Sequence, residues 1–152
     1  MTKRTNDIGA IHPLFIPTAR AILADIVALG LPFKVFETHR SAERQAKVLK
    51  DGKSKAGPGQ SPHNYGLAMD LVLDSDKIKV KSKEWRGKLY PWAWDNETPE
   101  CVRAWFALGE VARKHGATWG GDWSPRDESG LGWDYAHIEF TDWRNFMLWR
   151  DK

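Results

Sequence analysis

Apolar residues recur near the N-terminus with the spacing of an amphipathic helix. Between Pro13 and Leu29 they alternate at steps of four and three residues, and Gly30 follows as a stop signal. A second helix is predicted to begin after Ser41, a residue that favours the N-terminal cap, and to run to about Lys50. The first third of the chain therefore contributes two helices.

Two more helices are predicted in the second half of the chain. Thr98, Pro99 and Glu100 combine a capping residue, a ring with helical geometry and a negative charge at the start of a helix. We expect this helix to end at residues 114–116. A final helix is predicted from about Asp142 to Trp149.

Shorter apolar runs predict strands at Lys34–Thr38, Leu67–Leu73 and Tyr135–Phe140. Residues 51–62, which are rich in glycine, proline, serine and lysine, predict a loop between the second helix and the second of these strands. Long loops in small domains are usually functional or mobile. The pattern indicates an α+β fold with a small antiparallel sheet and about four helices.

A row of lysines two residues apart follows the second predicted strand. In an extended segment this spacing places four ammonium groups on one face. The pattern favours a solvated edge strand, which lysines protect against pairing with other sheets, over a face that attracts anions. The row consists of Lys77, Lys79, Lys81 and Lys83.

Composition narrows the class of protein. A chain of 152 residues with 41% hydrophobic and 28% charged residues is typical of one globular domain, here taken as residues 1–152, and excludes a disordered or fibrous protein. The single cysteine, Cys101, excludes an internal disulfide and a thiolate-rich zinc site. Any metal site must therefore use histidines and carboxylates.

Charge and hydropathy bear on partners and location. The net charge of +3 is compatible with an anionic partner without requiring one, so nucleic-acid binding is a weak alternative. No apolar run approaches the roughly 20 residues of a membrane span, and no signal-peptide core is visible. We expect synthesis in the cytoplasm without a signal peptide, no insertion into a membrane, and release to an outer target by another factor.

Nine tryptophans are the most unusual feature of the composition. Tryptophans in loops often line binding grooves, although they also close small cores from outside, and both interpretations stay open. Six of them lie in segments that are predicted as loops or loop edges: Trp85, Trp92, Trp94, Trp119, Trp123 and Trp133.

Three residues suggest a metal site. Asp70 is the one carboxylate within an apolar strand, where an unpaired charge is very costly, so it requires a partner. His63 lies in the preceding loop and His137 in a later predicted strand, and two imidazoles with one carboxylate form a normal catalytic zinc shell with an open fourth position. The remaining histidines are assigned to packing or surface positions: His12, His39 and His115.

Asp134, three residues before His137, is the best candidate for the group that moves protons during hydrolysis. A free aspartate has a pKa of about 3.9, so the site must raise that pKa by burial or hydrogen bonding. Trp133, Tyr135 and Trp119 are expected to provide a dry environment. No HExxH helix is present, which excludes the commonest zinc-protease layout.

These motifs resemble the M15 peptidases, which include D-alanyl-D-alanine carboxypeptidases and phage L-alanyl-D-glutamate endolysins. The upstream Arg40, Ser41 and Gln45, the pair Asp134 and His137, and the WGGDW string at 119–123 add to the likeness, the last pointing to the endolysin branch. Two positions depart from the usual pattern, His39 and Ala136. The first motif is matched by Ser61, His63, Gly66, Ala68 and Asp70.

The resemblance implies roles for individual residues. One zinc ion per chain would be bound by His63, Asp70 and His137, with Asp134 as general base and acid. Arg40 would take part in catalysis by binding the substrate, or else form a structural ion pair. Ser61 would hydrogen-bond the substrate, or only shape a turn. Gln45 is assigned to substrate binding. Glu139 shares a strand face with His137 and is a candidate to lie behind the metal ligands, although Asp134 fits the family pattern better.

The resemblance also implies a fold like that of hedgehog and D-Ala-D-Ala peptidases, and a function. We expect a monomeric zinc peptidase that hydrolyses peptidoglycan stem peptides at the L-alanyl-D-glutamate bond, as a phage-type endolysin that causes bacterial lysis. A D-alanyl-D-alanine carboxypeptidase is the alternative among enzymes. A non-catalytic, zinc-containing module that binds the cell wall is the alternative outside them.

Overall fold

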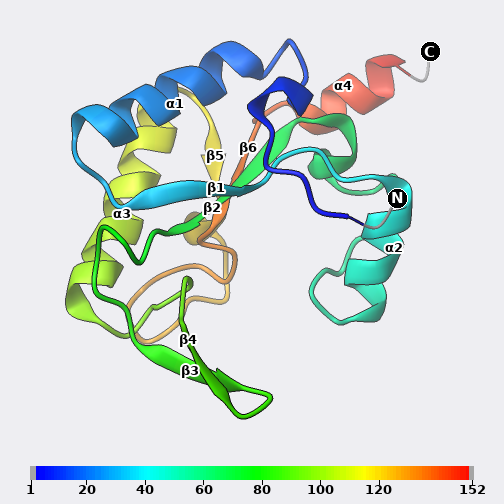
Figure 1. Ribbon diagram of the computed structural model, residues 1–152. Helices are drawn as coiled ribbons and strands as arrows, with labels where there is room; N and C mark the ends of the chain where they lie inside the picture. The colour runs from blue at the N-terminus through cyan, green and yellow to red at the C-terminus, as the bar shows by residue number, and fades with distance from the viewer. Residues whose placement is uncertain (1–2, 151–152) are drawn as a thin grey trace.

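The computed structural model describes residues 3–150 and contains a four-stranded antiparallel sheet and a separate two-stranded hairpin (Figure 1). The strand order of the larger sheet is β1-β2-β6-β5. The helices are α1 (Ile16–Ala28), α2 (Ala42–Lys50), α3 (Pro99–Lys114) and α4 (Trp143–Arg150), with short 3-10 helices η1 (Ile8–Ala10), η2 (Pro62–Tyr65) and η3 (Gly120–Asp122). The strands are β1 (Phe33–Glu37), β2 (Ala68–Leu73), β3 (Ser82–Trp85), β4 (Lys88–Pro91), β5 (Thr118–Trp119) and β6 (His137–Glu139).

The two faces of the larger sheet differ in chemistry. Met69, Leu71 and Ile138 belong to the same buried cluster as the apolar residues of α1 and α3. Because side chains alternate along a strand, Asp70 lies on the opposite face, directly across from His137 in the β2–β6 ladder. The predicted α+β fold, with its antiparallel sheet and four helices, is confirmed.

A β-bulge in β1 brings a charged residue to the polar face. Val35 pairs with Leu71, but the next recorded pair joins Glu37 to Asp70, so the register shifts by one residue at Phe36. A bulge redirects the side chains that follow it. Glu37 is consequently on the same face as Asp70 and is almost fully buried there.

The predicted helices are confirmed, with small differences at their ends. α1 begins at Ile16 because residues 13–15 form a turn, and the Oγ of Ser41 accepts a hydrogen bond from the backbone N of Arg44, as expected of a cap. Thr98 precedes α3, but its hydroxyl donates to Asp95 instead of capping the helix. The buried carboxylate of Asp95 accepts from the backbone N of Thr98 and of the residue before it.

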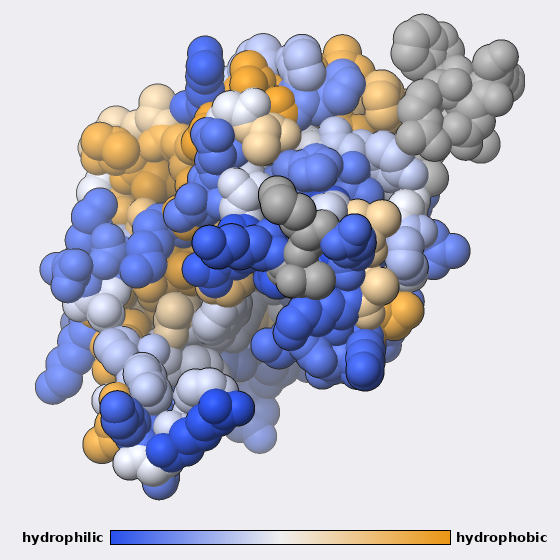
Figure 2. Space-filling model, turned by 45° about the vertical axis from the view of Figure 1, so that its right-hand side comes forward, coloured by the Kyte–Doolittle hydropathy of each residue, from blue (hydrophilic) through white to orange (hydrophobic). Residues whose placement is uncertain are grey.

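The predicted extended row of exposed lysines is formed only in part. Lys83 lies in β3, but Lys77 lies in a turn in which its backbone N donates to the carbonyl of Asp74 at 2.9 Å. Ile78 and Val80 are partly buried while Lys79 and Lys81 are exposed, so the side chains still alternate there, although these residues do not belong to a strand. The strands β3 and β4 form an exposed hairpin instead, and Figure 2 shows mostly hydrophilic residues at the lower end of the molecule, where this hairpin projects.

Trp119, expected in a loop or at a loop edge, lies in the short edge strand β5 with 1% of its surface exposed. Its ring packs so closely on α3 that a Cβ at Gly109 would be 2.2 Å from a ring atom. This tryptophan therefore belongs to the core. Within residues 3–150 no helix is both long and apolar enough to cross a membrane.

Candidate metal centre and active site

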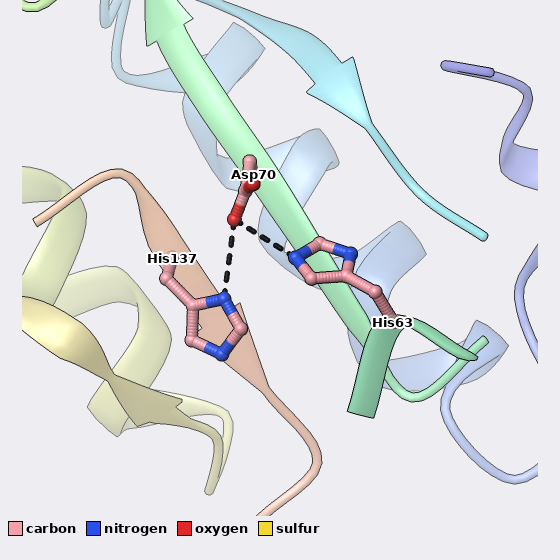
Figure 3. Close-up of side chains that lie close together, drawn as sticks. All are labelled: His63, Asp70 and His137. Atoms are coloured by element: carbon pink, nitrogen blue, oxygen red, sulfur yellow. Dashed lines mark hydrogen bonds and ion pairs between the residues drawn. The ribbon is translucent and has the colours of Figure 1, made fainter. Parts of the chain in front are cut away.

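Three side chains from different elements converge on the polar face of the sheet (Figure 3). Oδ1 of Asp70, on β2, lies 3.1 Å from Nε2 of His63 and 3.1 Å from Nδ1 of His137. The first histidine comes from η2 and the second from β6. One potential ligand atom from each residue lies within 4.8 Å of the others, which is close enough for all three to bind one metal ion.

The fold fixes which nitrogen of His63 faces the cluster. Its Nδ1 lies 2.7 Å from the carbonyl oxygen of Thr38, which can only accept, so Nδ1 carries the proton and Nε2 is left as a ligand. The short helix η2, which carries His63, is held by a capping box: the side chains of Ser61 and Asn64 each accept a hydrogen bond from the other residue's backbone. Gly66 ends η2 with a φ of 68°, and a Cβ there would be 2.7 Å from the backbone N of His12.

A carboxylate orients His137 from the other side. Its Nε2 lies 2.8 Å from Oε1 of Glu139, whose Oε2 accepts a hydrogen bond from Nε1 of Trp143 at 2.9 Å. The Nδ1 atom is therefore left to face Asp70. A carboxylate behind a histidine ligand is the usual arrangement at zinc sites, so the structure places Glu139 where it supports the ligand.

The charges of the cluster suit a divalent cation. Burial raises the pKa of Asp70, but the charge and hydrogen bonds of His63 and His137 outweigh burial and hold that pKa below its usual range. Burial lowers the pKa of His137, but hydrogen bonds to Asp70 and Glu139 outweigh it and raise the pKa to about 10. Without a metal the site thus keeps a proton, which a bound cation would displace. The donor set of two imidazoles and one carboxylate fits zinc.

Asp134 lies beside the three candidate ligands in the same cleft of about 240 Å³. Its carbonyl accepts a hydrogen bond from the backbone N of His137 at 3.0 Å, which keeps it next to the cluster. Burial raises the pKa of Asp134, and the charge of Asp70 adds to the effect. Of the three aromatic residues expected to keep this region dry, Trp119 is buried and Tyr135 is partly buried, whereas Trp133 lines the cleft with 54% of its surface exposed. The role of Asp134 as base stays a prediction.

Arg40 is buried at the base of the cleft. Its Nη2 lies 2.7 Å from Oε1 of Glu37 and 3.8 Å from Oδ2 of Asp70, and its Nη1 donates to Gln45 at 3.0 Å. Among the described atoms its Nε has no hydrogen-bond partner. The structure thus shows the ion pair expected of a structural role for Arg40. Its Nε remains available as a donor to substrate, so contact with substrate stays a prediction.

The two other predicted substrate residues differ in position. Ser61 lines the cleft, although its Oγ already accepts from the backbone N of His63. Gln45 is fully buried and does not line the cleft; its Nε2 donates to Ser54 at 3.0 Å and to the carbonyl of Ala56 at 2.7 Å. Gln45 therefore supports the loop above it, and its assignment to substrate binding stays a prediction.

Two tryptophans that the sequence left open as groove or core residues line the cleft, whereas three cations on its wall were not foreseen. Trp123 and Trp133, two of the tryptophans expected in loops, line the cleft together with Arg144 at the start of α4. Lys53 and Lys55 line it from the loop between α2 and η2. The loop's length marked it as a candidate functional segment, but nothing in the local sequence distinguished these two lysines from other surface lysines.

Comparison with known proteins agrees with this geometry. Residues 54–140, more than half of the chain, match the profile of an M15 peptidase family described as D-alanyl-D-alanine carboxypeptidase. The chain belongs to the M15 peptidases. This M15 peptidase is also 29% identical over 139 residues to the peptidoglycan L-alanyl-D-glutamate endopeptidase CwlK of Bacillus subtilis, with 85% of this chain and 72% of CwlK covered.

Solved structures support the same fold. The L-Ala D-Glu endopeptidase ChiX of Serratia marcescens is 25% identical to this M15 peptidase, with a TM-score of 0.56 and coverage of 96% of this chain and 92% of that one. The vancomycin resistance D,D-pentapeptidase VanY, solved in complex with Zn(II), is 16% identical with a TM-score of 0.55, covering 93% and 79%. The second likeness concerns the fold alone.

Proposed function

We propose that this M15 peptidase hydrolyses the L-alanyl-D-glutamate bond of peptidoglycan stem peptides, with one zinc ion bound by His63, Asp70 and His137. The observation that carries the proposal is the convergence of these three ligand atoms within 4.8 Å, in a cleft that also contains Asp134. The names of CwlK and ChiX, two relatives that each align over most of this chain, supply the bond.

The residues of the cleft divide the work of hydrolysis. A zinc ion held by His63, Asp70 and His137 would supply Lewis acidity toward the peptide carbonyl and toward water. Asp134 accepts the proton of the attacking water and delivers it to the nitrogen of the departing D-glutamate, a task for which its raised pKa suits it. Glu139 and the carbonyl of Thr38 hold the two imidazoles in the required tautomers.

Muropeptide mass spectrometry tests the proposed bond. Zinc-loaded protein should convert a muropeptide into a glycan-linked L-alanine and a free peptide that begins with D-glutamate. The description of the matching family profile favours one alternative, a D-alanyl-D-alanine carboxypeptidase, which would release free D-alanine and leave the stem peptide attached. Release of D-alanine alone would replace our proposal with that alternative.

We further propose that the enzyme acts as a phage-type endolysin, as a monomer that reaches the wall after another factor opens the membrane. The WGGDW string at residues 119–123, which resembles the endolysin branch, supports this role. Expression in bacteria together with a pore-forming factor should cause lysis, whereas expression alone should not. Lysis that does not depend on the pore-forming factor would contradict this release route.

A non-catalytic wall-binding module with a structural zinc is the alternative outside enzymes. Asp134 argues against it, because a structural site has no use for a carboxylate of raised pKa beside an open metal position. Binding of purified peptidoglycan without any new peptide ends would favour this module over our proposal.

A further inference from the structure

We infer that the cleft has a second binding site for substrate, formed by the side chains of Lys53, Lys55 and Arg144, which selects stem peptides with free carboxylates on the leaving side of the scissile bond. This inference rests on the proposed function, because it concerns the peptide that the same cleft cleaves. All three residues line the cleft that contains the candidate metal ligands.

Arg40, the cation nearest the candidate metal ligands, is already engaged. Its guanidinium donates to Glu37 at 2.7 Å and to Gln45 at 3.0 Å, and it is only 9% exposed. A charge that is compensated by a buried carboxylate attracts a second carboxylate weakly. Further anionic groups of the substrate must therefore find their partners elsewhere on the cleft wall.

The exposed edge of the cleft, called the rim from here on and formed by Lys53, Lys55 and Arg144, provides such partners. Lys53, Lys55 and Arg144 are exposed, and none of them forms an ion pair with a carboxylate among the described side chains. They reach the cleft from two sides, since the lysines belong to the loop after α2 and the arginine to the first turn of α4. Three uncompensated cations around one cleft create a positive potential at its mouth.

Aromatic side chains on the cleft wall lie next to these cations. The Nζ of Lys55 lies 6.0 Å from the centroid of the Trp133 ring, so the loop meets the opposite wall beside Asp134. The guanidinium of Arg144 lies 4.6 Å from the centroid of the Trp143 ring, whose indole is fixed by Glu139. One cation thus lies near an aromatic residue of the cleft wall, and another lies beside the tryptophan that binds Glu139.

The loop that carries the two lysines is tied to the base of the site. The amide of Gln45 bonds Arg40 through its oxygen, and its nitrogen donates to the hydroxyl of Ser54 and the carbonyl of Ala56. The same hydroxyl accepts from the backbone N of Ala56 at 3.1 Å. Because these bonds involve residues between and beside Lys53 and Lys55, the lysines start from a fixed backbone, which lowers the entropy cost of gripping a ligand.

The chemistry of the proposed substrate matches this arrangement. A glutamate that continues the chain through one of its two carboxyl groups keeps the other free, unless that group is amidated. Some cell walls add a further carboxylate on the third residue of the stem, where others have a lysine. The cations of Lys53, Lys55 and Arg144 attract stem peptides with additional carboxylates and repel those with a lysine at the third residue. The structure therefore assigns this enzyme to acidic, non-amidated stem peptides.

Two muropeptides that differ only in whether the D-glutamate carboxyl is free or amidated test the inference. We expect kcat/KM of the wild type to favour the free acid by about tenfold, because the one carboxylate that differs between the peptides can pair with two of the exposed cations, at up to about threefold each. The preference should lie mainly in KM and should shrink as salt screens the charges. In the triple variant Lys53→Gln, Lys55→Gln and Arg144→Gln the preference should largely disappear.

A matched triple variant controls for net charge. Lys77→Gln, Lys88→Gln and Arg103→Gln remove three exposed cations that lie outside the cleft, and this variant should keep the activity and the preference of the wild type. Equal rates for the two muropeptides in the wild type, or an unchanged preference in the rim variant, would overturn the inference.

A binding measurement separates the inference from the proposed function. Calorimetric titration of both muropeptides into zinc-loaded Asp134→Asn protein should show the same roughly tenfold preference without turnover. If the wild type cleaves neither muropeptide, the proposed function fails, while the titration still decides whether the cationic site exists. Equal affinities for the two peptides in this titration would contradict the cationic site itself.

Discussion

The two faces of the four-stranded sheet use the same strands for opposite purposes. On one face, Leu71 of β2 and Ile138 of β6 are completely buried against the helices. On the other face, Asp70 and His137, their neighbours in the same strands, form a charged cluster. The stability of the first face depends on close packing of apolar side chains. The second face holds charged groups whose balance a bound cation would complete.

This difference explains how a strand as apolar as β2 can carry a charge. The apolar positions on its core face supply the stability, and the bulge in β1 brings Glu37 and the Arg40 that it binds to the polar face. Changes on the core face should therefore affect stability, and changes on the polar face should affect metal binding and hydrolysis.

The largest effect is expected on the polar face, at Asp134. The variant Asp134→Asn removes the proposed proton carrier, and kcat for muropeptide hydrolysis should fall by about 1,000-fold. Zinc content and the unfolding midpoint should stay close to those of the wild type. A variant that retains most of its activity would refute the assigned base, and one that has lost its zinc would mean that Asp134 is a ligand.

On the core face, Leu71→Ala should lower the free energy of unfolding by about 3 kcal/mol, because a fully buried leucine leaves a cavity. Urea unfolding of the metal-free protein measures this change. Lys34→Ala, an exposed position in the adjacent strand, should change stability by less than about 0.5 kcal/mol. Equal losses in the two variants would mean that the two faces are not separated as described.

Asp95 offers a comparison with Asp70, because it is a buried carboxylate whose partners are N–H and O–H groups instead of histidines. Burial raises its pKa, but these hydrogen bonds outweigh burial and lower the pKa to about 2. Since the folded pKa lies below the unfolded value of about 3.9, the stabilisation is present above pH 4 and is lost as the pH falls toward 2.

The loss amounts to about 2 kcal/mol. Stability of the wild type, followed by urea unfolding from pH 5 to pH 2, should therefore fall more steeply than that of Asp95→Asn. Parallel curves for the two proteins would show that Asp95 is not linked to folding in this way.

The smallest of these effects is expected at Glu139. Glu139→Gln weakens the hold on Nε2 of His137, and the zinc dissociation constant should rise by about tenfold. Competition with a fluorescent chelator measures this constant, and Glu84→Gln in the exposed hairpin is the matched control. A dissociation constant equal to that of the control would assign Glu139 to packing alone.

The sequence was most informative where one side chain conflicted with its surroundings. Asp70 within an apolar strand requires a partner, and the structure places His63 and His137, the two histidines that the sequence marks as candidates, beside it. Helix caps such as Ser41 were also readable, because the relevant hydrogen bonds join residues close in the chain.

Features that depend on distant contacts could not be predicted. Trp119 is buried only because Gly109, ten residues away on α3, leaves room for its ring. Lys55 lines the cleft only because Gln45 holds its loop in place. In each case the sequence near the residue resembles an ordinary loop, and only the tertiary structure gives the position its meaning.

The central claim is that the polar face binds one zinc ion through His63, Asp70 and His137. Elemental analysis of zinc in purified, zinc-reconstituted protein tests it most directly, with Asp70→Asn and Asp134→Asn measured beside the wild type. We expect one zinc per chain in the wild type and in Asp134→Asn, and almost none in Asp70→Asn. A full equivalent of zinc in Asp70→Asn, or none in the wild type, would contradict the claim.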